Sequence, residues 1–449
     1  MMMTIKSDWV EYLKTWIKYN NYLHIFILLT LRLIFDVLYV KYMHEVWAHK
    51  GFDYSWQLLK YIESWLLFLC VAFSLPGTLR VTSDMFVTVI GIAVLLPMTS
   101  MYGLTSEPRW IIYSILLGHV VILATRKARL FNIPVISNNQ EIPLYLSLFS
   151  VCVVVSWMCI SGAVYHINFD FSEVYNRRSE VGALINKGFF SYLNGWVLKA
   201  FNLFLLAYGL YKKNWMLVAI SIVIQIFLFS VIAHKAILFY PILIIFIWLW
   251  FRKNTSLTFV PLLIIGVVLI SATIWKISGD QYSLMISLVV RRMFYVVANN
   301  IYDYYHYFSS NQFIYWSNSL TTRFIEYPYT ENYPDLVGSF QAVIVGREGT
   351  DAADTYVNSS FLATGYMHAG FLGLILYCFL VGLLFRIVDV IANQSMPIWF
   401  AVSIMLIPMF SLISSADLPT ALLTHGVIVS ILLLLFSRHS LHQVEDSQS

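Results

Sequence analysis

Two adjacent arginines, Arg177 and Arg178, lie in a polar segment that spans residues 166–194. Planar guanidinium groups fit phosphate oxygens in a bidentate manner, so such a pair is suited to gripping a phosphate. Asp170 and Glu173 precede the pair, so acids lie next to the two guanidinium groups in the sequence. The alternative is a solvated loop in which these charges form surface ion pairs.

A second basic group, His234–Lys235, falls in a very short turn between two apolar segments. We expect this turn at the membrane–water boundary. There the pair either holds a lipid-linked anion at headgroup depth or only extends its charges toward water. The sequence leaves both interpretations open.

The longest stretch that cannot lie inside a bilayer spans residues 276–360 and includes Arg323. Within it, residues 284–305 are amphipathic at helical period, which predicts an interfacial or re-entrant helix. This helix carries Arg291 and Arg292. Adjacent helical positions differ by about 100° in direction, so at least one of the two must face protein, water or a ligand.

Aromatic and small polar residues surround the rest of this stretch. Tyr304 and Tyr305 form either a sugar-stacking surface or a membrane-interface belt. Residues 354–360 lead directly into an apolar segment that contains Gly365 and Gly373, and small residues at such spacing allow close helix packing. We therefore expect the polar edge at 354–360 to line the floor of a site.

Motifs for nucleotides and metals are absent from the sequence. It has no P-loop, no GxGxxG before a strand, no HExxH and no carboxylate cluster at metal-ligand spacing. We expect no cofactor and no metal. The energy for any reaction must then arrive with the substrate, and a polyprenyl-diphosphate sugar would supply it through its leaving group. The net charge of +4 gives no indication of nucleic-acid binding.

The bulk composition describes a membrane protein. The 449 residues are 59% hydrophobic and 12% charged, with a mean hydropathy of +0.73, whereas soluble domains carry about 25% charged residues. Continuous apolar runs predict an all-α, polytopic chain, with residues 1–449 forming one transmembrane domain. The first apolar block reads as a retained helix, since no small-residue cleavage pattern follows it.

Apolar runs of helical length predict about twelve spans. They fall near residues 21–41, 57–76, 83–102, 108–125, 143–165, 195–211, 214–232, 236–251, 257–275, 361–386, 397–415 and 420–437. Short basic connections at residues 126–129, 212–213 and 252–253 belong in the cytoplasm by the positive-inside rule, which places both termini there. The segments 166–194 and 276–360 are then large periplasmic loops.

The first predicted span contains two charged residues, Arg32 and Asp36. Their spacing of four places them on one helix face, where they can neutralise each other. The pair is either structural or functional.

The order of these pieces resembles the bacterial O-antigen polymerase family, also called oligosaccharide repeat unit polymerases. The resemblance covers about residues 140–390. It is carried by Val174-Tyr175-Asn176-Arg177-Arg178, Gln225 to Phe229 before His234-Lys235, Arg292, Tyr304-Tyr305, Phe308, Tyr356-Val357-Asn358, Gly365-Tyr366 and Gly370-Phe371-Leu372-Gly373. This chain has Ala233 where a glycine is expected before the His-Lys pair, and the doubled arginines leave open which member matters.

The resemblance implies a glycosyltransferase in the bacterial inner membrane. Such an enzyme transfers a growing glycan from undecaprenyl diphosphate to a new lipid-linked repeat unit on the periplasmic side, without a nucleotide sugar. The implied partners are the undecaprenyl-diphosphate-linked oligosaccharide, membrane lipid and a polysaccharide co-polymerase that regulates chain length.

The candidate site residues fall into two groups within that reaction. Those expected to stabilise the leaving diphosphate or activate the acceptor are Arg178, Arg292, His234, Asp170, Glu173 and Asp354. Those expected to bind substrate are Arg177, Arg291, Lys235, Tyr175, Tyr304, Tyr305, Arg323, Tyr356 and Asn358.

Three other functions compete with polymerisation. An O-antigen ligase performs the same chemistry on a lipid A-core acceptor. A transporter or flippase for lipid-linked oligosaccharides would concentrate polar residues inside its spans, whereas here most lie in the loops. A purely structural membrane scaffold is the remaining alternative.

Overall fold

The computed structural model describes residues 21–129, 141–169, 174–232, 234–280, 282–319, 321–329, 359–393 and 395–438, with the side chains of Asn21 and of residues 174–179 outside that description. Within these ranges the regular structure is helical, which confirms the all-α prediction there. In the same ranges, Thr78 and Ser256 form an isolated antiparallel β-bridge.

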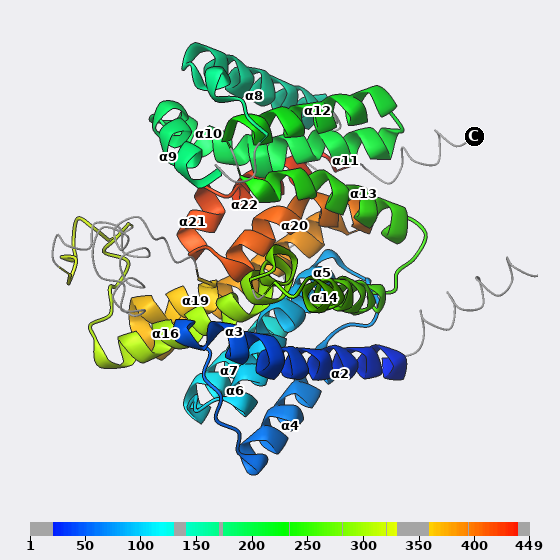
Figure 1. Cartoon of the computed structure of the whole chain (residues 1–449). Coiled ribbons are helices and arrows are strands. Elements are labelled where there is room, and N and C mark those ends of the chain that lie inside the picture. The colour runs from blue at the N-terminus through cyan, green and yellow to red at the C-terminus, as the bar shows by residue number, and fades with distance from the viewer. Residues whose placement is uncertain are drawn as a thin grey trace, which may run out of the picture.

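The chain builds its first group of helices before residue 130. These are α2 (Asn21–Leu38), η1 (Tyr39–His44), α3 (Glu45–Trp47), η2 (Ala48–Lys50), α4 (Leu58–Ser74), α5 (Thr82–Ile90), η3 (Gly91–Leu95), α6 (Leu96–Leu104) and α7 (Arg109–Thr125). In Figure 1 they occupy the blue to cyan part of the molecule.

A second group follows and packs apart from the first. It consists of α8 (Glu141–Ile160), η4 (Ala163–His166), α9 (Val174–Ile185), α10 (Phe190–Trp196), η5 (Val197–Phe201), α11 (Asn202–Lys212), α12 (Trp215–Ile232), η6 (Lys235–Leu238) and α13 (Phe239–Phe251). The chain then adds α14 (Phe259–Ser278), α15 (Leu284–Ile286), η7 (Ser287–Tyr295), α16 (Val296–Ser310), α19 (Phe361–Ala392), α20 (Ile398–Ser414), α21 (Leu418–Leu423) and α22 (Val427–Phe436).

Eight of the described helical segments are long and apolar enough to cross a membrane, and four shorter helices are also apolar. Their exposed faces are apolar too: only 17% of the window in Phe259–Ser278 is buried, and Ile270 and Ile277 are 57% and 80% exposed. A helix that is apolar on its exposed side requires lipid rather than water around it. The chain therefore has the helices of a membrane protein.

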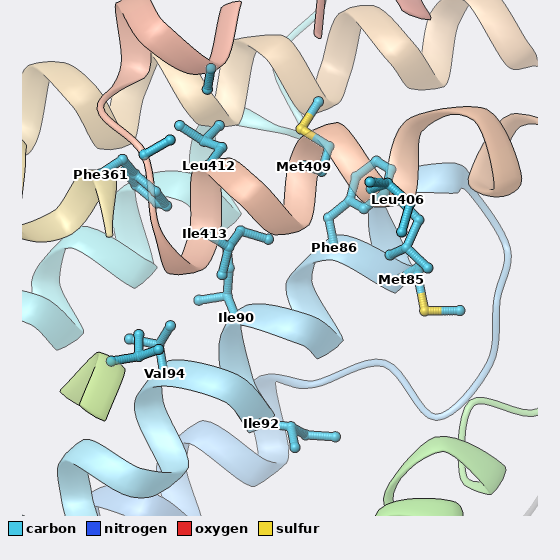
Figure 2. Close-up of a cluster of buried hydrophobic side chains, with 14 of the residues drawn as sticks. Met85, Phe86, Ile90, Ile92, Val94, Phe361, Leu406, Met409, Leu412 and Ile413 are labelled. Carbon is cyan, nitrogen blue, oxygen red and sulfur yellow. The ribbon is translucent and has the colours of Figure 1, made fainter. Parts of the chain in front are cut away.

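The helix α20 joins the two groups. It packs against α5 and α19 on one side and against α11, α13 and α22 on the other. Figure 2 shows part of this core, where Leu406 and Ile413 of α20 meet Phe86 and Ile90 of α5. The side chains labelled there are apolar, so their burial fixes α20 as the common wall of both groups.

The segment after residue 276, which the sequence predicts as a large loop, contains a long helix. Residues 284–310 form one continuous helix through α15, η7 and α16, and this helix is among those long and apolar enough to cross a membrane. Its Tyr295 hydroxyl donates to the carbonyl oxygen of Phe35 at 2.7 Å, and its Tyr302 hydroxyl donates to that of Met98 at 3.0 Å. The segment is therefore packed into the first group of helices.

The helix α19 is broken at Ala369 and Gly370. Gly370 has φ 60° and ψ −141°, a conformation that glycine adopts readily because it lacks a Cβ atom. Gly365 and Gly373 approach closely across this break, since a Cβ atom on Gly365 would lie 3.0 Å from the Gly373 carbonyl oxygen. The close approach expected of these small residues thus occurs within α19 itself.

The Arg32–Asp36 pair forms inside the first group. Arg32 is fully buried and donates to the carboxylate of Asp36 and, at 2.8 Å, to the carbonyl oxygen of Thr99. Asp36 also accepts from the hydroxyl groups of Ser100 at 2.5 Å and Tyr61 at 3.0 Å. Because protein groups satisfy both charges in the core, the geometry favours the structural interpretation.

Figure 1 separates the connections into two ends of the bundle. The helices α3 and α9 and the segment 311–329 lie on its left, whereas the α11–α12 turn and the α13–α14 connection lie on its right. We call these the left and right ends below. The right-hand connections carry Lys212–Lys213 and Arg252–Lys253, the basic pairs expected in the cytoplasm.

Candidate functional site

A group of basic side chains, which we call the basic seam, gathers between η5, the α12–η6 turn and the α21–α22 turn. Its centre is Lys199, whose Nζ lies 2.8 Å from Nδ1 of His425 and 3.2 Å from Oγ of Ser411. Lys199, in η5, and His425, in the α21–α22 turn, are partly buried and lie 226 residues apart in the sequence. An ammonium group donating to a neutral imidazole nitrogen gives this arrangement.

Two glycines allow the α21–α22 turn to reach Lys199. A Cβ atom on Gly195 would lie 2.6 Å from the carbonyl oxygen of Thr424, so only glycine permits this approach of backbone to backbone. Gly426 has φ +83°, which lets the chain turn immediately after His425. The indole N–H of Trp196 donates to the carbonyl oxygen of Leu423 and fixes the same turn.

His234, in the α12–η6 turn, is close enough to His425 to interact with it electrostatically. Burial first, then the charges of Lys199 and His234, lower the pKa of His425 to about 3. His425 is therefore neutral near pH 7 and accepts a hydrogen bond from Lys199. Lys235, the next residue after His234, opens η6. Of the His-Lys pair that the sequence singled out, His234 thus interacts electrostatically with His425.

The segment 166–194 docks beside this turn. The backbone N–H of Asn168 donates to the carbonyl oxygen of Ser230 at 3.1 Å, four residues before His234. The rings of Phe169 and Phe229 lie 6.5 Å apart. The helix α9 then packs against α12 and η4. Two pieces that the sequence analysis treated separately are therefore adjacent.

Several predicted site residues of this segment lie outside what the structure describes. Tyr175, Arg177 and Arg178 belong to helix α9, whose backbone is described, but their side chains are not described. Asp170 and Glu173 lie outside the described residues. The structure supports the placement of α9 beside the seam, and the roles of these side chains stay predictions.

The second arginine pair occupies a different part of the molecule. Arg291 places its guanidinium carbon 3.9 Å above the Trp47 ring and donates to Ser287 at 3.2 Å, while Arg292 is exposed. Their element η7 packs against α14, α6 and η3, whereas the seam is built from η5, η6 and the helices around α20. The structure therefore does not place Arg292 in the basic seam.

Tyr304 and Tyr305 do not form an exposed stacking surface. Both are fully buried, and Tyr305 stacks on Tyr366 at 4.0 Å with its hydroxyl 3.4 Å from the carbonyl oxygen of Leu362. Since every face of these rings is covered by protein, they stabilise the contact between α16 and α19. The prediction that they stack on sugars is wrong for this structure.

A buried histidine–aspartate pair lies beneath the break in α19. His368 Nε2 lies 3.1 Å from Oδ2 of Asp417, and His368 Nδ1 accepts the backbone N–H of Trp316 at 3.2 Å. With Nδ1 accepting, Nε2 must carry the proton and donate to the carboxylate. The Trp316 ring also stacks on His368 at 4.8 Å, so segment 311–319 is clamped onto α19.

The helix α21 links the His368–Asp417 pair, which we call the clamp, to the basic seam. Asp417 caps the first turn of α21 by accepting from the N–H of Leu418 at 2.9 Å, and α21 ends at Leu423, two residues before His425. The short helix thus spans the distance between the clamp and the seam. Arg323, further along the clamped segment, is exposed, and Asp354, Tyr356 and Asn358 lie outside the described residues.

A histidine–glutamate pair sits at the start of the α6–α7 connection. His306 Nε2 lies 2.6 Å from Oε2 of Glu107, and the two side chains are 48% and 20% exposed. The His306–Glu107 pair is therefore a further candidate for accepting a proton from a reacting hydroxyl group. No group of three metal-ligating side chains occurs among the residues that the structure describes.

Sequence reasoning missed Lys199, His368, Asp417 and His425 as a set. The signal was present for three of them, because Lys199, His368 and His425 are ionisable residues inside predicted spans, where such residues are rare. Their partners could not be read from the sequence.

In the comparison with known proteins, no family model, no curated protein and no solved structure matches this chain.

Proposed function

We propose that this protein is a multi-pass glycosyltransferase of the bacterial inner membrane. In this proposal it polymerises undecaprenyl-diphosphate-linked repeat units at the periplasmic face. The observation that carries the proposal is the convergence of Lys199, His234 and His425, next to a helix that bears Arg177 and Arg178. A lysine ammonium at the edge of an apolar bundle, beside a helix that bears two arginines, suits a lipid-linked diphosphate.

The reaction breaks the bond between the anomeric carbon and the diphosphate oxygen of the donor glycan. The acceptor hydroxyl oxygen forms the new glycosidic bond and loses its proton to a base, and undecaprenyl diphosphate leaves with the electron pair. Negative charge grows on the departing diphosphate, and a preorganised donor aimed at such charge is worth about 2.7–4 kcal/mol. Lys199 is held ready for that role by His425 and Ser411.

The acceptor base remains among the predicted candidates His234, Asp170, Glu173 and Asp354. Arg292 and the pair His306–Glu107 belong to the other helical group, where we place the acceptor glycan. This division gives donor and acceptor separate binding regions at the same end of the bundle.

The topology that goes with this proposal has about twelve spans and both termini in the cytoplasm. The left end of Figure 1 is then periplasmic, and the right end, with Lys212–Lys213 and Arg252–Lys253, is cytoplasmic. A chain-length regulator of the co-polymerase type is the proposed protein partner.

Purified protein in detergent, given lipid-linked repeat units, tests the proposal. Polymer formed without a sealed compartment requires catalysis and excludes a pure transporter. Transfer only to lipid A-core would identify a ligase instead. The variant Lys199→Met should lower the rate about a hundredfold, the usual effect of removing one oxyanion donor. Lys253→Met, an exposed lysine at the right end, is the matched control. Normal polymer from Lys199→Met at equal protein level would refute the assignment.

A further inference from the structure

We propose that Gln225 is a positioning residue that holds the two halves of the basic seam at a fixed separation. The proposal rests on the proposed function of the seam as a phosphate site. Gln225 lies in the middle of α12 and is 1% exposed, so it touches neither water nor a substrate. It acts through the segments that carry Lys199 and His234.

The side-chain amide of Gln225 bridges those two segments. Its Nε2 lies 3.3 Å from the carbonyl oxygen of Leu198, the residue before Lys199. The same nitrogen lies 3.4 Å from the carbonyl oxygen of Ile237, in the short helix η6 that follows His234. One amide group therefore links η5 to η6.

The π-helical geometry of η5 changes the backbone hydrogen bonds next to Leu198. In an α-helix the N–H of Asn202 would bond the carbonyl oxygen of Leu198, four residues earlier. In η5, a π-helical turn, the Asn202 N–H bonds the carbonyl oxygen of Val197 instead. The Asn202 N–H is therefore not bonded to the Leu198 carbonyl oxygen as it would be in an α-helix, and Gln225 donates to that oxygen. Such π-helical insertions are frequent at functional sites.

The orientation of the Gln225 amide is also fixed. Asn202 Nδ2 donates to Oε1 of Gln225 at 2.5 Å and to the carbonyl oxygen of Ser221 at 3.0 Å. An amide nitrogen can only donate, so Oε1 must face Asn202 while Nε2 faces the two carbonyls. The Gln225 amide consequently has a single orientation in this bridge. Because a misplacement of about 1 Å can lower a rate about a hundredfold, this bridge matters for a site built from two segments.

The variant Gln225→Met tests the bridge, since methionine has a similar length but neither donates nor accepts as an amide does. In the full-length protein in detergent we expect the polymerisation rate to fall tenfold to about a hundredfold. Binding of inorganic pyrophosphate, measured by calorimetry, should weaken in parallel. The control is Ser221→Ala, one turn away in α12, whose hydroxyl bonds only its own helix at Leu217, 2.8 Å away. It should leave both quantities unchanged.

A double variant separates positioning from general stabilisation. If Gln225 acts through Lys199, adding Gln225→Met to Lys199→Met should lower the rate by less than about twofold. A full additional loss would show that Gln225 does not act through Lys199 and would overturn the proposal. Gln225→Leu provides a second variant, because leucine neither accepts from Asn202 nor donates to the two carbonyls. Wild-type behaviour of that variant would also overturn the proposal.

The outcomes for the wild-type protein distinguish this inference from the proposed function. If the wild-type protein binds pyrophosphate or forms polymer and Gln225→Met does so equally well, only the positioning role fails. If the wild-type protein does neither, the proposed function fails and the positioning role fails with it.

Discussion

The pKa of His425 predicts how the stability of the protein changes with pH. Burial and the neighbouring charges of Lys199 and His234 lower this pKa to about 3 in the folded state, whereas an unfolded histidine has a pKa of about 6.5. Between these values the unfolded chain binds a proton that the folded chain does not. The stabilising contribution is therefore complete above about pH 6.5 and is lost as the pH falls toward 3.

The size of the effect follows from the two pKa values. Between pH 7 and pH 5, linkage gives a loss of about 2 kcal/mol in the free energy of unfolding from this one group. The variant His425→Gln cannot titrate and should lose that part of the pH dependence. The variant Lys199→Met removes one cause of the depressed pKa, so it should retain a smaller pH dependence than the wild type.

Chemical denaturation in a neutral detergent, followed by tryptophan fluorescence at pH 7 and pH 5, measures these differences. His49→Gln is the control, because His49 is exposed on η2. Equal pH dependence in the wild type and His425→Gln would refute the reasoning, since it would mean that His425 is protonated in the fold or already solvated.

Two further predictions concern the backbone break and the buried ion pair. Gly370→Ala should lower the free energy of unfolding by about 2 kcal/mol or more, because its φ of 60° disfavours a side chain and the new methyl would lie 2.9 Å from a phenylalanine ring; an unchanged denaturation midpoint would contradict this. Arg32→Met should lower it by about 3–5 kcal/mol by leaving Asp36 buried without its partner. Adding Asp36→Leu should restore part of that loss, and further destabilisation in the double variant would contradict the structural role assigned to the pair.

Local pattern was enough to predict the helices and one ion pair. Each predicted span is occupied by helix in the structure, because a continuous apolar run of helical length has few other ways to satisfy its backbone in lipid. Arg32 and Asp36 meet because a spacing of four residues places them on one helix face. The short turn at His234–Lys235 likewise follows from two apolar runs that nearly touch in the sequence.

Burial of the aromatic residues was decided by packing. The same periodicity that places Tyr304 and Tyr305 on a helix suits either an exposed belt or a packed core. Only the neighbouring helix α19, which stacks Tyr366 on Tyr305, determines that the rings are covered. Sequence periodicity identifies a face but does not identify what lies against it.

The site itself was decided by tertiary structure. The sequence by itself determined that this chain is a set of apolar helices with basic residues at their ends. It could not bring Lys199 to His425, which lie 226 residues apart, because that contact depends on the approach of α10 to the turn after α21. Hydrophobic patterning is local and sets which residues form helices, whereas the meeting of charges from distant helices depends on how those helices pack.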